Sequence, residues 1–340
     1  MSVLDPTKTV MQTLGDFGPG GGGVSVEEAR AYALGFARRA NENFVVLGRL
    51  LPADLVSDFA AVYTFCRWAD DLGDEVDPSL GEDPQPEAVR ERALALLGWF
   101  RGELESDAPR HPVLVALGPT IERHGLGRSE FGKLISAFEM DQRVCAYATW
   151  EQLMGYCRLS ADPVGRIVMM MAGLRPPEED ARSAEAWRKS DAICSALQLT
   201  NHVQDVRRDL LERGRVYLPR AVVGFGIDEL RDWVDRPGDS TVRVRYIRGV
   251  RPVVERTWSL YREGGDLPSL IGGRPGDLVG MMARGGRSTL GAVERMGCAT
   301  LWKRPSVGKG RRAAIALGGL ASLYFGAWRN LYPSSNASKH

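Results

Sequence analysis

The stretch that decides the fold is Tyr63-Thr-Phe-Cys-Arg67-Trp-Ala-Asp70-Asp-Leu-Gly-Asp74-Glu. On a helix, residues three or four positions apart share a face. The spacing therefore predicts one stripe made of Tyr63, Arg67, Asp70 and Asp74. Two carboxylates on one face repel each other by about 0.2–0.5 kcal/mol, so the pattern needs a cation to become favourable. Mg²⁺ suits this role, because it prefers oxygen ligands and commonly binds one or two carboxylates together with substrate phosphates.

A carboxylate pair of this kind, standing alone, is more typical of a solvated acidic face than of a metal site. The residues around it indicate burial, because apolar side chains occupy most of the helix circumference. They are Val62, Phe65, Cys66, Trp68, Ala69 and Leu72. Buried carboxylates require partners or a metal ion, which favours a functional role for the pair.

A second acidic pair ends the stretch Asp191-Ala-Ile-Cys-Ser-Ala-Leu-Gln-Leu-Thr-Asn-His-Val-Gln-Asp205-Val-Arg-Arg-Asp209. Helical spacing predicts that one face carries Cys194, Gln198, Asn201, Asp205 and Asp209. The pattern also fits a surface helix, but a solvent face would use Lys and Glu rather than small neutral polar groups. Two such helices can face each other across the cavity of a helical bundle.

Arginines follow the second acidic pair directly, before the element Val216-Tyr-Leu-Pro219. They are Arg207, Arg208, Arg213 and Arg215. The guanidinium fork matches phosphate oxygens, although each of these arginines could also be an ordinary surface charge. Arg215 is the favoured functional one because it is closest to the Tyr-Leu-Pro element. Acids and arginines together predict a site that holds a phosphate-bearing substrate through metal ions.

Helical spacing recurs along the rest of the chain, whereas β-branched runs with a period of two are almost absent. We expect an all-α fold with helices at 25–46, 54–72, 86–105, 129–145, 150–172, 182–212, 241–264 and 288–297. No Gly- or Pro-rich break is long enough to be an interdomain linker. We therefore predict a flexible segment at 1–24, one helical domain at 25–305, and a basic and apolar C-terminal helix and tail at 306–340.

The composition argues against a general nucleic-acid binder, because 44 Lys and Arg against 43 Asp and Glu leave a net charge of +1. The five cysteines are odd in number, widely spaced and free of C-x-x-C motifs. This usage predicts reduced thiols in a cytoplasmic protein without structural zinc. The N-terminus also lacks the basic and apolar regions of a secretory signal.

An apolar segment near the C-terminus, Ala313–Trp328, has 16 uncharged residues and follows the basic residues Lys309, Arg311 and Arg312. It is shorter than the roughly 20 residues that a membrane-spanning helix needs. A buried final helix is the favoured interpretation. Peripheral contact with an anionic membrane surface stays open, because basic residues beside an apolar helix also suit that role.

The chain resembles the squalene/phytoene synthase family. YTFCRWADDLGDE, at 63–75, is similar to the family element Y-x-x-C-R-x-x-D-D-x-x-D-E, and QLTNHVQDVRRDLLERGRVYLP, at 198–219, is similar to Q-L-T-N-x-x-x-D-V-x-x-D…G-R-x-Y-L-P. The resemblance covers about residues 27–305. It implies a single-domain isoprenoid-synthase helical bundle with a central cavity.

The resemblance also implies roles for individual residues. Mg²⁺, as two or three ions with the diphosphate, would be held by Asp70, Asp74, Asn201, Asp205 and Asp209. Tyr63 and Arg67 would contact the diphosphate and act in catalysis with the aspartates. The remaining substrate-binding residues would be Asn41, Phe44, Tyr156, Val164, Gly165, Gln198 and Arg215.

Within the family, Asn41-Glu-Asn-Phe44 and Tyr156-Cys-Arg-Leu-Ser-Ala-Asp-Pro-Val-Gly165 look most like the hydroxysqualene synthases of the bacterial hopanoid pathway. Where condensing members carry a tyrosine, this chain has Arg284-Gly-Gly-Arg-Ser-Thr-Leu290, which puts a role for that tyrosine in doubt. The implied reaction is Mg²⁺-dependent conversion of presqualene diphosphate and water to hydroxysqualene and diphosphate. NADPH is not expected, and other enzymes of the squalene pathway are expected partners.

Two alternatives stay open. The first is a condensing squalene or phytoene synthase that joins prenyl diphosphates head to head. The second is a non-catalytic member of the fold that serves as an assembly or binding protein. The intact aspartates argue against the second, because their loss would be its simplest sign in the sequence.

Overall fold

The computed structural model of the chain describes residues 4–40, 53–81, 84–174 and 181–305. Within these ranges the regular structure is helical, with one isolated bridge between Ala146 and Val216. The all-α prediction is confirmed. The helices of the N-terminal half are α1 Val10–Phe17, α2 Val26–Ala40, α4 Ala53–Asp74, the short 3₁₀ helix η1 Pro78–Leu80, α5 Pro86–Glu105, α6 Pro112–His124 and α7 Arg128–Asp141.

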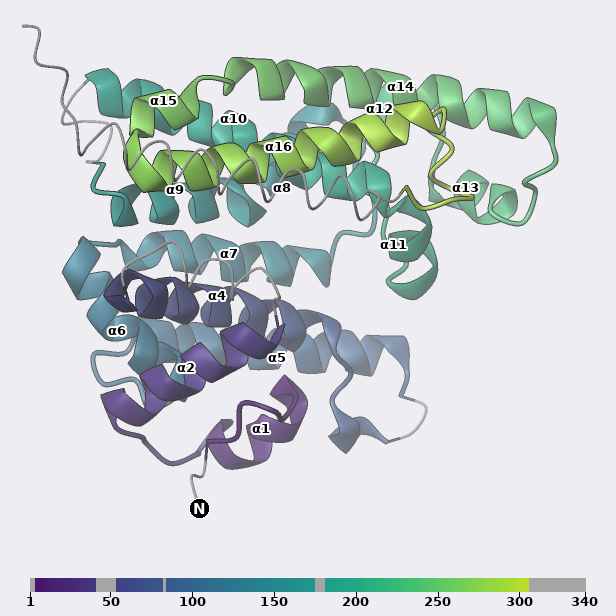
Figure 1. Cartoon of the computed structure of the whole chain (residues 1–340). Helices are drawn as coiled ribbons and strands as arrows, with labels where there is room; N and C mark the ends of the chain where they lie inside the picture. The colour runs from purple at the N-terminus through teal and green to yellow at the C-terminus, as the bar shows by residue number, and fades with distance from the viewer. Residues whose placement is uncertain (1–3, 41–52, 82–83, 175–180, 306–340) are drawn as a thin grey trace, which may run out of the picture.

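The C-terminal half is also built of helices. They are α8 Trp150–Ser160, α9 Asp162–Met171, α10 Ala181–Gln204, α11 Val206–Glu212, α12 Arg220–Val223, α13 Ile227–Trp233, α14 Ser240–Glu263, α15 Leu267–Ile271 and α16 Gly273–Arg295. Figure 1 shows the two halves as neighbouring groups, with α7 facing α8 and α9 where they meet. The central helix of the first half is α4, which packs on α2, α5, α6 and α7. Its counterpart in the second half is α10, which packs on α8, α9, α14 and α16.

Each half has its own hydrophobic core. In the first, the Phe65 ring of α4 lies 5.4 Å from the Phe100 ring and 5.0 Å from the Phe131 ring, and Trp68 is fully buried beside them. The apolar circumference of α4 therefore comes from burial on several sides, as the sequence predicts. Phe65 belongs to this core, and its ring does not line the pocket described below.

The N-terminal segment differs from the expectation of a flexible lead-in at 1–24. Helix α1 forms there, because Thr9 and Gln12 make a capping box that satisfies backbone N–H groups at its start. Val10 and Phe17 are buried in the core of the first half. Burial of these few apolar side chains holds the segment against the core. The many glycines around them are the reason that the composition did not predict this.

Two helices expected to be continuous are each broken in the structure. The helix predicted at 150–172 divides at Ala161, which precedes Asp162-Pro163 at the start of α9. A proline belongs in the first turn of a helix, because its missing N–H would be unpaired there anyway. The helix predicted at 182–212 divides at Asp205, whose φ of −105° and ψ of 15° are not helical. This second break falls at one of the predicted site residues.

No helix in the described ranges is long and apolar enough to cross a membrane. The predicted C-terminal helix and tail at 306–340, including Ala313–Trp328, lie outside the described residues. All five cysteines lie in the described ranges and are unpaired there.

Candidate active site

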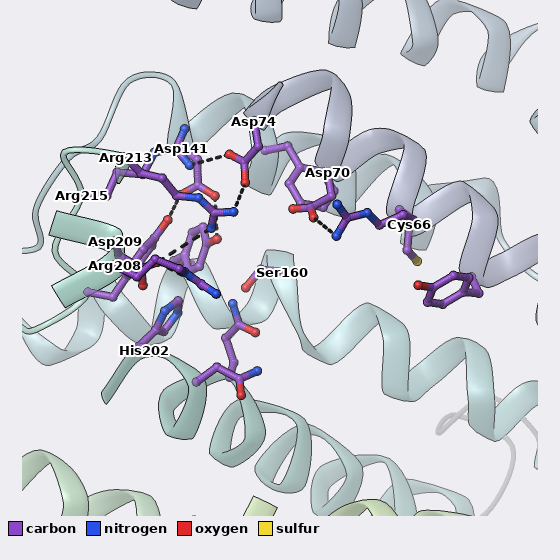
Figure 2. A pocket seen from close by; sticks show the side chains of 17 residues that line it. Cys66, Asp70, Asp74, Asp141, Ser160, His202, Arg208, Asp209, Arg213 and Arg215 are labelled. Carbon is purple, nitrogen blue, oxygen red and sulfur yellow. Dashed lines mark hydrogen bonds and ion pairs between the residues drawn. The ribbon is translucent and has the colours of Figure 1, made fainter. Parts of the chain in front are cut away.

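A pocket of about 370 Å³ lies where the two halves meet. Its walls come from α4, α7, α8, α10, α11 and the loop after α11 (Figure 2). It is lined by Tyr63, Cys66, Arg67, Asp70, Asp74, Phe138, Asp141, Tyr156, Ser160, Gln198, Asn201, His202, Arg208, Asp209, Arg213, Arg215 and Tyr217. Charged and hydrogen-bonding side chains dominate this lining, which suits a polar ligand group such as a phosphate.

The stripe predicted on α4 faces this pocket: Tyr63, Arg67, Asp70 and Asp74 all line it. Arg67 binds the neighbouring Asp71 through two nitrogens, at 2.5 and 3.0 Å, and approaches Asp70 less closely, at 3.4 Å. Burial raises the pKa of Asp70 and the charge of Asp74 adds to it, while Arg67 opposes both effects. A carboxylate whose charged form is disfavoured in this way would gain from a cation.

Asp74 is held by two arginines from the loop after α11. Arg213 Nη2 lies 2.6 Å from one carboxylate oxygen, and Arg215 Nη1 lies 2.9 Å from the other. Figure 2 shows both guanidinium groups reaching across the pocket to α4. The acids and arginines that the sequence predicts as parts of one site therefore meet, and they bind each other.

The second acidic helix brings only part of its predicted face to the pocket. Gln198, Asn201 and Asp209 line it, whereas Asp205 lines a neighbouring cavity of about 270 Å³. Asp205 binds Arg304 through two nitrogens, at 2.6 and 3.1 Å. The backbone around Asp205 still makes helical hydrogen bonds of 2.9 Å, from Asp205 N to Asn201 O and from Asp209 N to Asp205 O. The Asp205 carboxylate is set apart by its ion pair with Arg304.

Asp209 is nevertheless linked to its partner acid. Arg208 Nη2 lies 2.9 Å from Asp205 and 3.2 Å from Asp209, so one guanidinium bridges the two carboxylates. Burial raises the pKa of Asp209, and the charge of Arg208 opposes that rise. The positive charge of Arg208 thus offsets the repulsion between these two carboxylates, as a bound metal ion could.

The remaining predicted substrate-binding residues are only partly brought together. Tyr156 lines the pocket, but Val164 packs against the core of the first half. Gly165 sits where α9 crosses α10: a Cβ atom there would lie 2.5 Å from both Cys194 Sγ and Ser190 Oγ. Its role in the structure is close helix packing, away from the lining of the pocket. Asn41 and Phe44 lie outside the described residues.

A partly buried carboxylate that the sequence analysis missed lies in one wall of the pocket. Asp141, the last residue of α7, accepts hydrogen bonds of 2.7 Å from both Tyr156 Oη and Tyr217 Oη. Burial raises the pKa of Asp141 to about 6, while the charge of Arg215 and the tyrosine hydrogen bonds oppose the rise. Tyr217 belongs to the quoted Tyr-Leu-Pro element, but nothing in the local pattern of α7 singles out Asp141.

The donor chemistry of the pocket fits Mg²⁺. Asp70, Asp74, Asn201 and Asp209 supply only oxygen ligands of the kind that hard cations prefer. No group of three or more His, Cys, Asp or Glu side chains in the described part of the chain is arranged to hold a metal by itself. Mg²⁺ needs no such cage, since it keeps several waters and takes phosphate oxygens as ligands.

A family model described as squalene/phytoene synthase matches residues 37–311. The chain belongs to the squalene/phytoene synthase family. Members of this family are synthases that act on prenyl diphosphates, which agrees with a pocket of aspartates and arginines. The predicted single helical isoprenoid-synthase domain with a central cavity is likewise confirmed.

Curated relatives within the squalene/phytoene synthase family include several hydroxysqualene synthases. The chain is 34% identical to that of Zymomonas mobilis over 54% of its own length and 56% of the relative. It is 34% identical to that of Rhodopseudomonas palustris over 68% of its own length and 72% of the relative. The phytoene synthase of Mycobacterium tuberculosis is 31% identical over 57% of this chain and 59% of that protein.

Solved structures agree with the family assignment. The squalene synthase HpnC of Alicyclobacillus acidocaldarius has a TM-score of 0.66 and 34% identity, and the match covers 85% of this chain and 98% of that chain. A dehydrosqualene synthase in complex with a ligand has a TM-score of 0.64, with 88% and 98% covered. Because the dehydrosqualene synthase is only 20% identical to this chain, its similarity supports the fold alone.

Proposed function

We propose that the protein is a hydroxysqualene synthase, which converts presqualene diphosphate and water to hydroxysqualene and diphosphate with Mg²⁺. The observation that carries the proposal is that aspartates of α4 and α11 and four arginines line one pocket. The arginines are Arg67, Arg208, Arg213 and Arg215. A diphosphate needs such charges most when its bond to carbon breaks and its negative charge grows.

Asp70, Asp74, Asn201 and Asp209 are proposed to hold the metal, and Asp205 is proposed to join them by leaving Arg304. Bound Mg²⁺ would neutralise charge on the departing diphosphate. Asp74 would then release Arg213 and Arg215, whose guanidinium groups become free to donate to phosphate oxygens. Tyr63 and Arg67, from the same face of α4, are proposed to contact the diphosphate as well.

The choice of hydroxysqualene rests on two supports. Three relatives named hydroxysqualene synthase are 30–34% identical to this chain. The segment Tyr156–Gly165, on which the resemblance to these enzymes rests, contributes Tyr156 and Ser160 to the pocket. Capture of the carbocation by water consumes no reductant, so NADPH is not part of the proposal.

A condensing activity is the second candidate. It is favoured by the solved structure at 34% identity, which is described as a squalene synthase and is covered over 98% of its chain. To separate the two, the purified protein would be incubated with Mg²⁺ and either presqualene diphosphate or farnesyl diphosphate. We expect hydroxysqualene from the first, detected by mass spectrometry. Product from farnesyl diphosphate alone would refute the hydroxysqualene proposal.

The non-catalytic alternative and the metal assignment are tested with Asp70→Ala and Asp205→Ala. We expect either variant to abolish turnover while the helical circular-dichroism signal stays intact. Wild-type turnover in both would overturn the metal assignment. Absence of turnover in the unmodified protein, with Mg²⁺ and both substrates, would favour an assembly or binding role.

The prenyl diphosphate substrate implies partners as well. We propose that enzymes of the squalene pathway supply the substrate and take up the product. Peripheral contact with a membrane surface through the basic and apolar residues 309–328 belongs to the same proposal. Sedimentation of the full chain with anionic vesicles, compared with a chain ending at residue 305, tests this contact.

A further inference from the structure

Two buried polar atoms of the pocket wall have no hydrogen-bond partner in the described part of the chain. They are Ser160 Oγ, at the end of α8, and His202 Nε2, on α10. Both residues line the pocket and are labelled in Figure 2. Leaving such an atom unpaired costs about 1–3 kcal/mol, so two in one pocket point to a polar ligand that binds them.

The His202 ring is rigidly held. It stacks on the Tyr217 ring with centroids 3.9 Å apart and an angle of 12° between the planes. The Tyr217 hydroxyl is in turn fixed by Asp141 at 2.7 Å. His202 is only 6% exposed, so Nε2 has a defined direction in a shielded wall. This rigidity is what a site for one small ligand requires.

The hydrogen-bonding capacities of the two side chains fit a small ligand. An uncharged imidazole offers one N–H donor and one bare nitrogen acceptor, and a serine hydroxyl can both donate and accept. The pair therefore suits a small ligand with both capacities, such as water.

We propose that Ser160 Oγ and His202 Nε2 bind the water molecule that becomes the hydroxyl of the product. This inference rests on the proposed hydroxysqualene synthase function and names the residues that decide between alcohol and hydrocarbon. The carbon–oxygen bond to diphosphate breaks, and the electron pair leaves with the diphosphate. A lone pair of the bound water forms the new carbon–oxygen bond to the rearranged cation. The proton that the water loses passes to the released diphosphate.

Without a held water, the same cation would lose a proton from a neighbouring carbon to the diphosphate and give a hydrocarbon with one more double bond. This competing step needs no reductant. The ratio of alcohol to hydrocarbon therefore reports on the bound water, whereas the total rate of diphosphate release reports on ionisation. The two readouts separate water binding from a general structural role.

The test uses Ser160→Ala and His202→Phe, which remove the polar atoms and keep approximate shape, with purified protein, Mg²⁺ and presqualene diphosphate. We expect the ratio of alcohol to hydrocarbon to fall about tenfold in each variant, the effect of about one hydrogen bond. His202→Gln, which keeps a polar group near Nε2, should restore part of the ratio. The matched control is Ser195→Ala, because the Ser195 hydroxyl donates to Asp162 and does not line the pocket.

The outcomes separate this inference from the proposed function. If the unmodified protein makes no hydroxysqualene from presqualene diphosphate, the proposed function itself fails. If it makes hydroxysqualene and the variants keep its product ratio, the water site is wrong. A high-resolution crystal structure of the unmodified protein gives a check that is independent of variant folding. We expect an ordered water within hydrogen-bond distance of both atoms, and a dry wall there would overturn the inference.

Discussion

Arg215 Nη1 lies 2.9 Å from an Asp74 carboxylate oxygen, which joins the loop after α11 to the end of α4. Asp141 carries a second negative charge near the same guanidinium, and these charges raise the pKa of Arg215 although burial opposes the effect. Arg215 is therefore a fixed positive charge between two acids from different helices. Its loss would leave both acids without a shared partner.

We expect Arg215→Ala to raise the KM for the diphosphate substrate by about 10- to 100-fold, the range for hydrogen bonds to a charged group. Steady-state kinetics with presqualene diphosphate measure the effect. Arg231→Ala is the control, since Arg231 forms an exposed ion pair with Asp228 on α13. An unchanged KM in Arg215→Ala would exclude Arg215 from diphosphate binding.

The buried carboxylate of Asp58 joins three helices of the first half. It accepts hydrogen bonds from Arg30 at 2.7 Å, Thr120 at 2.9 Å, Arg123 at 2.9 Å and His124 at 2.8 Å. We expect Asp58→Ala to lower the free energy of unfolding by about 1–3 kcal/mol, because the buried Thr120 hydroxyl and the partly buried Arg30 would lose their hydrogen-bond acceptor. Urea unfolding at pH 7 measures this loss.

Asp58 also predicts how stability changes with pH. Burial alone raises the pKa of this carboxyl, but hydrogen bonds from Arg30, His124 and Thr120 outweigh burial and hold the pKa below 3.8. A carboxyl group whose pKa is lowered on folding stabilises the folded state at any pH above its pKa in the unfolded chain. This stabilisation is lost as the pH falls through the pKa of the folded state. The difference in stability between the unmodified protein and Asp58→Asn should therefore shrink below about pH 4. A difference that grows on acidification would contradict this account.

Asp141 predicts that activity also falls on acidification, at a higher pH than the change in stability. Its pKa is raised to about 6, so the carboxylate that accepts both tyrosine hydrogen bonds is lost as the pH falls through that value. We expect kcat to decline below about pH 6 in the unmodified protein. Asp141→Asn should remove that acid limb from the pH–rate profile. The control is Glu139→Gln, whose carboxylate binds Arg101 outside the pocket. Persistence of the limb in Asp141→Asn would assign it to another group.

Gly165 predicts a packing effect. Its added Cβ would lie 2.5 Å from Cys194 Sγ and from Ser190 Oγ, so Gly165→Ala should destabilise the protein by about 1–3 kcal/mol. Gly155→Ala is the matched control on α8, because the nearest atom to its Cβ would be Arg158 Nη2 at 3.7 Å. Chemical denaturation compares the two. Equal stability of both variants would show that the contact between α9 and α10 tolerates a Cβ atom at Gly165, and would refute close packing as its role.

The residues of α4 illustrate what could be predicted locally. One pocket is lined by all four residues of the predicted stripe, Tyr63, Arg67, Asp70 and Asp74. They share a face because α4 is unbroken and has 3.6 residues per turn, so their spacing in the sequence is enough to predict it. Asp205 and Asp209 follow the same spacing, yet only Asp209 lines the pocket. Asp205 instead pairs with Arg304, which lies 99 positions later in the chain, so no local spacing predicts this contact.

By itself, the sequence determined the helical class, the family and the chemical character of the site, because periodicity and residue type are local properties. The tertiary structure decided which groups meet. Asp141 and His202 reach the pocket because α7 and α10 both pack against α8. A hydrogen bond from the Tyr217 hydroxyl holds Asp141, and a stack on the Tyr217 ring holds His202. Such pairings depend on contacts between segments far apart in the chain, which no local pattern contains.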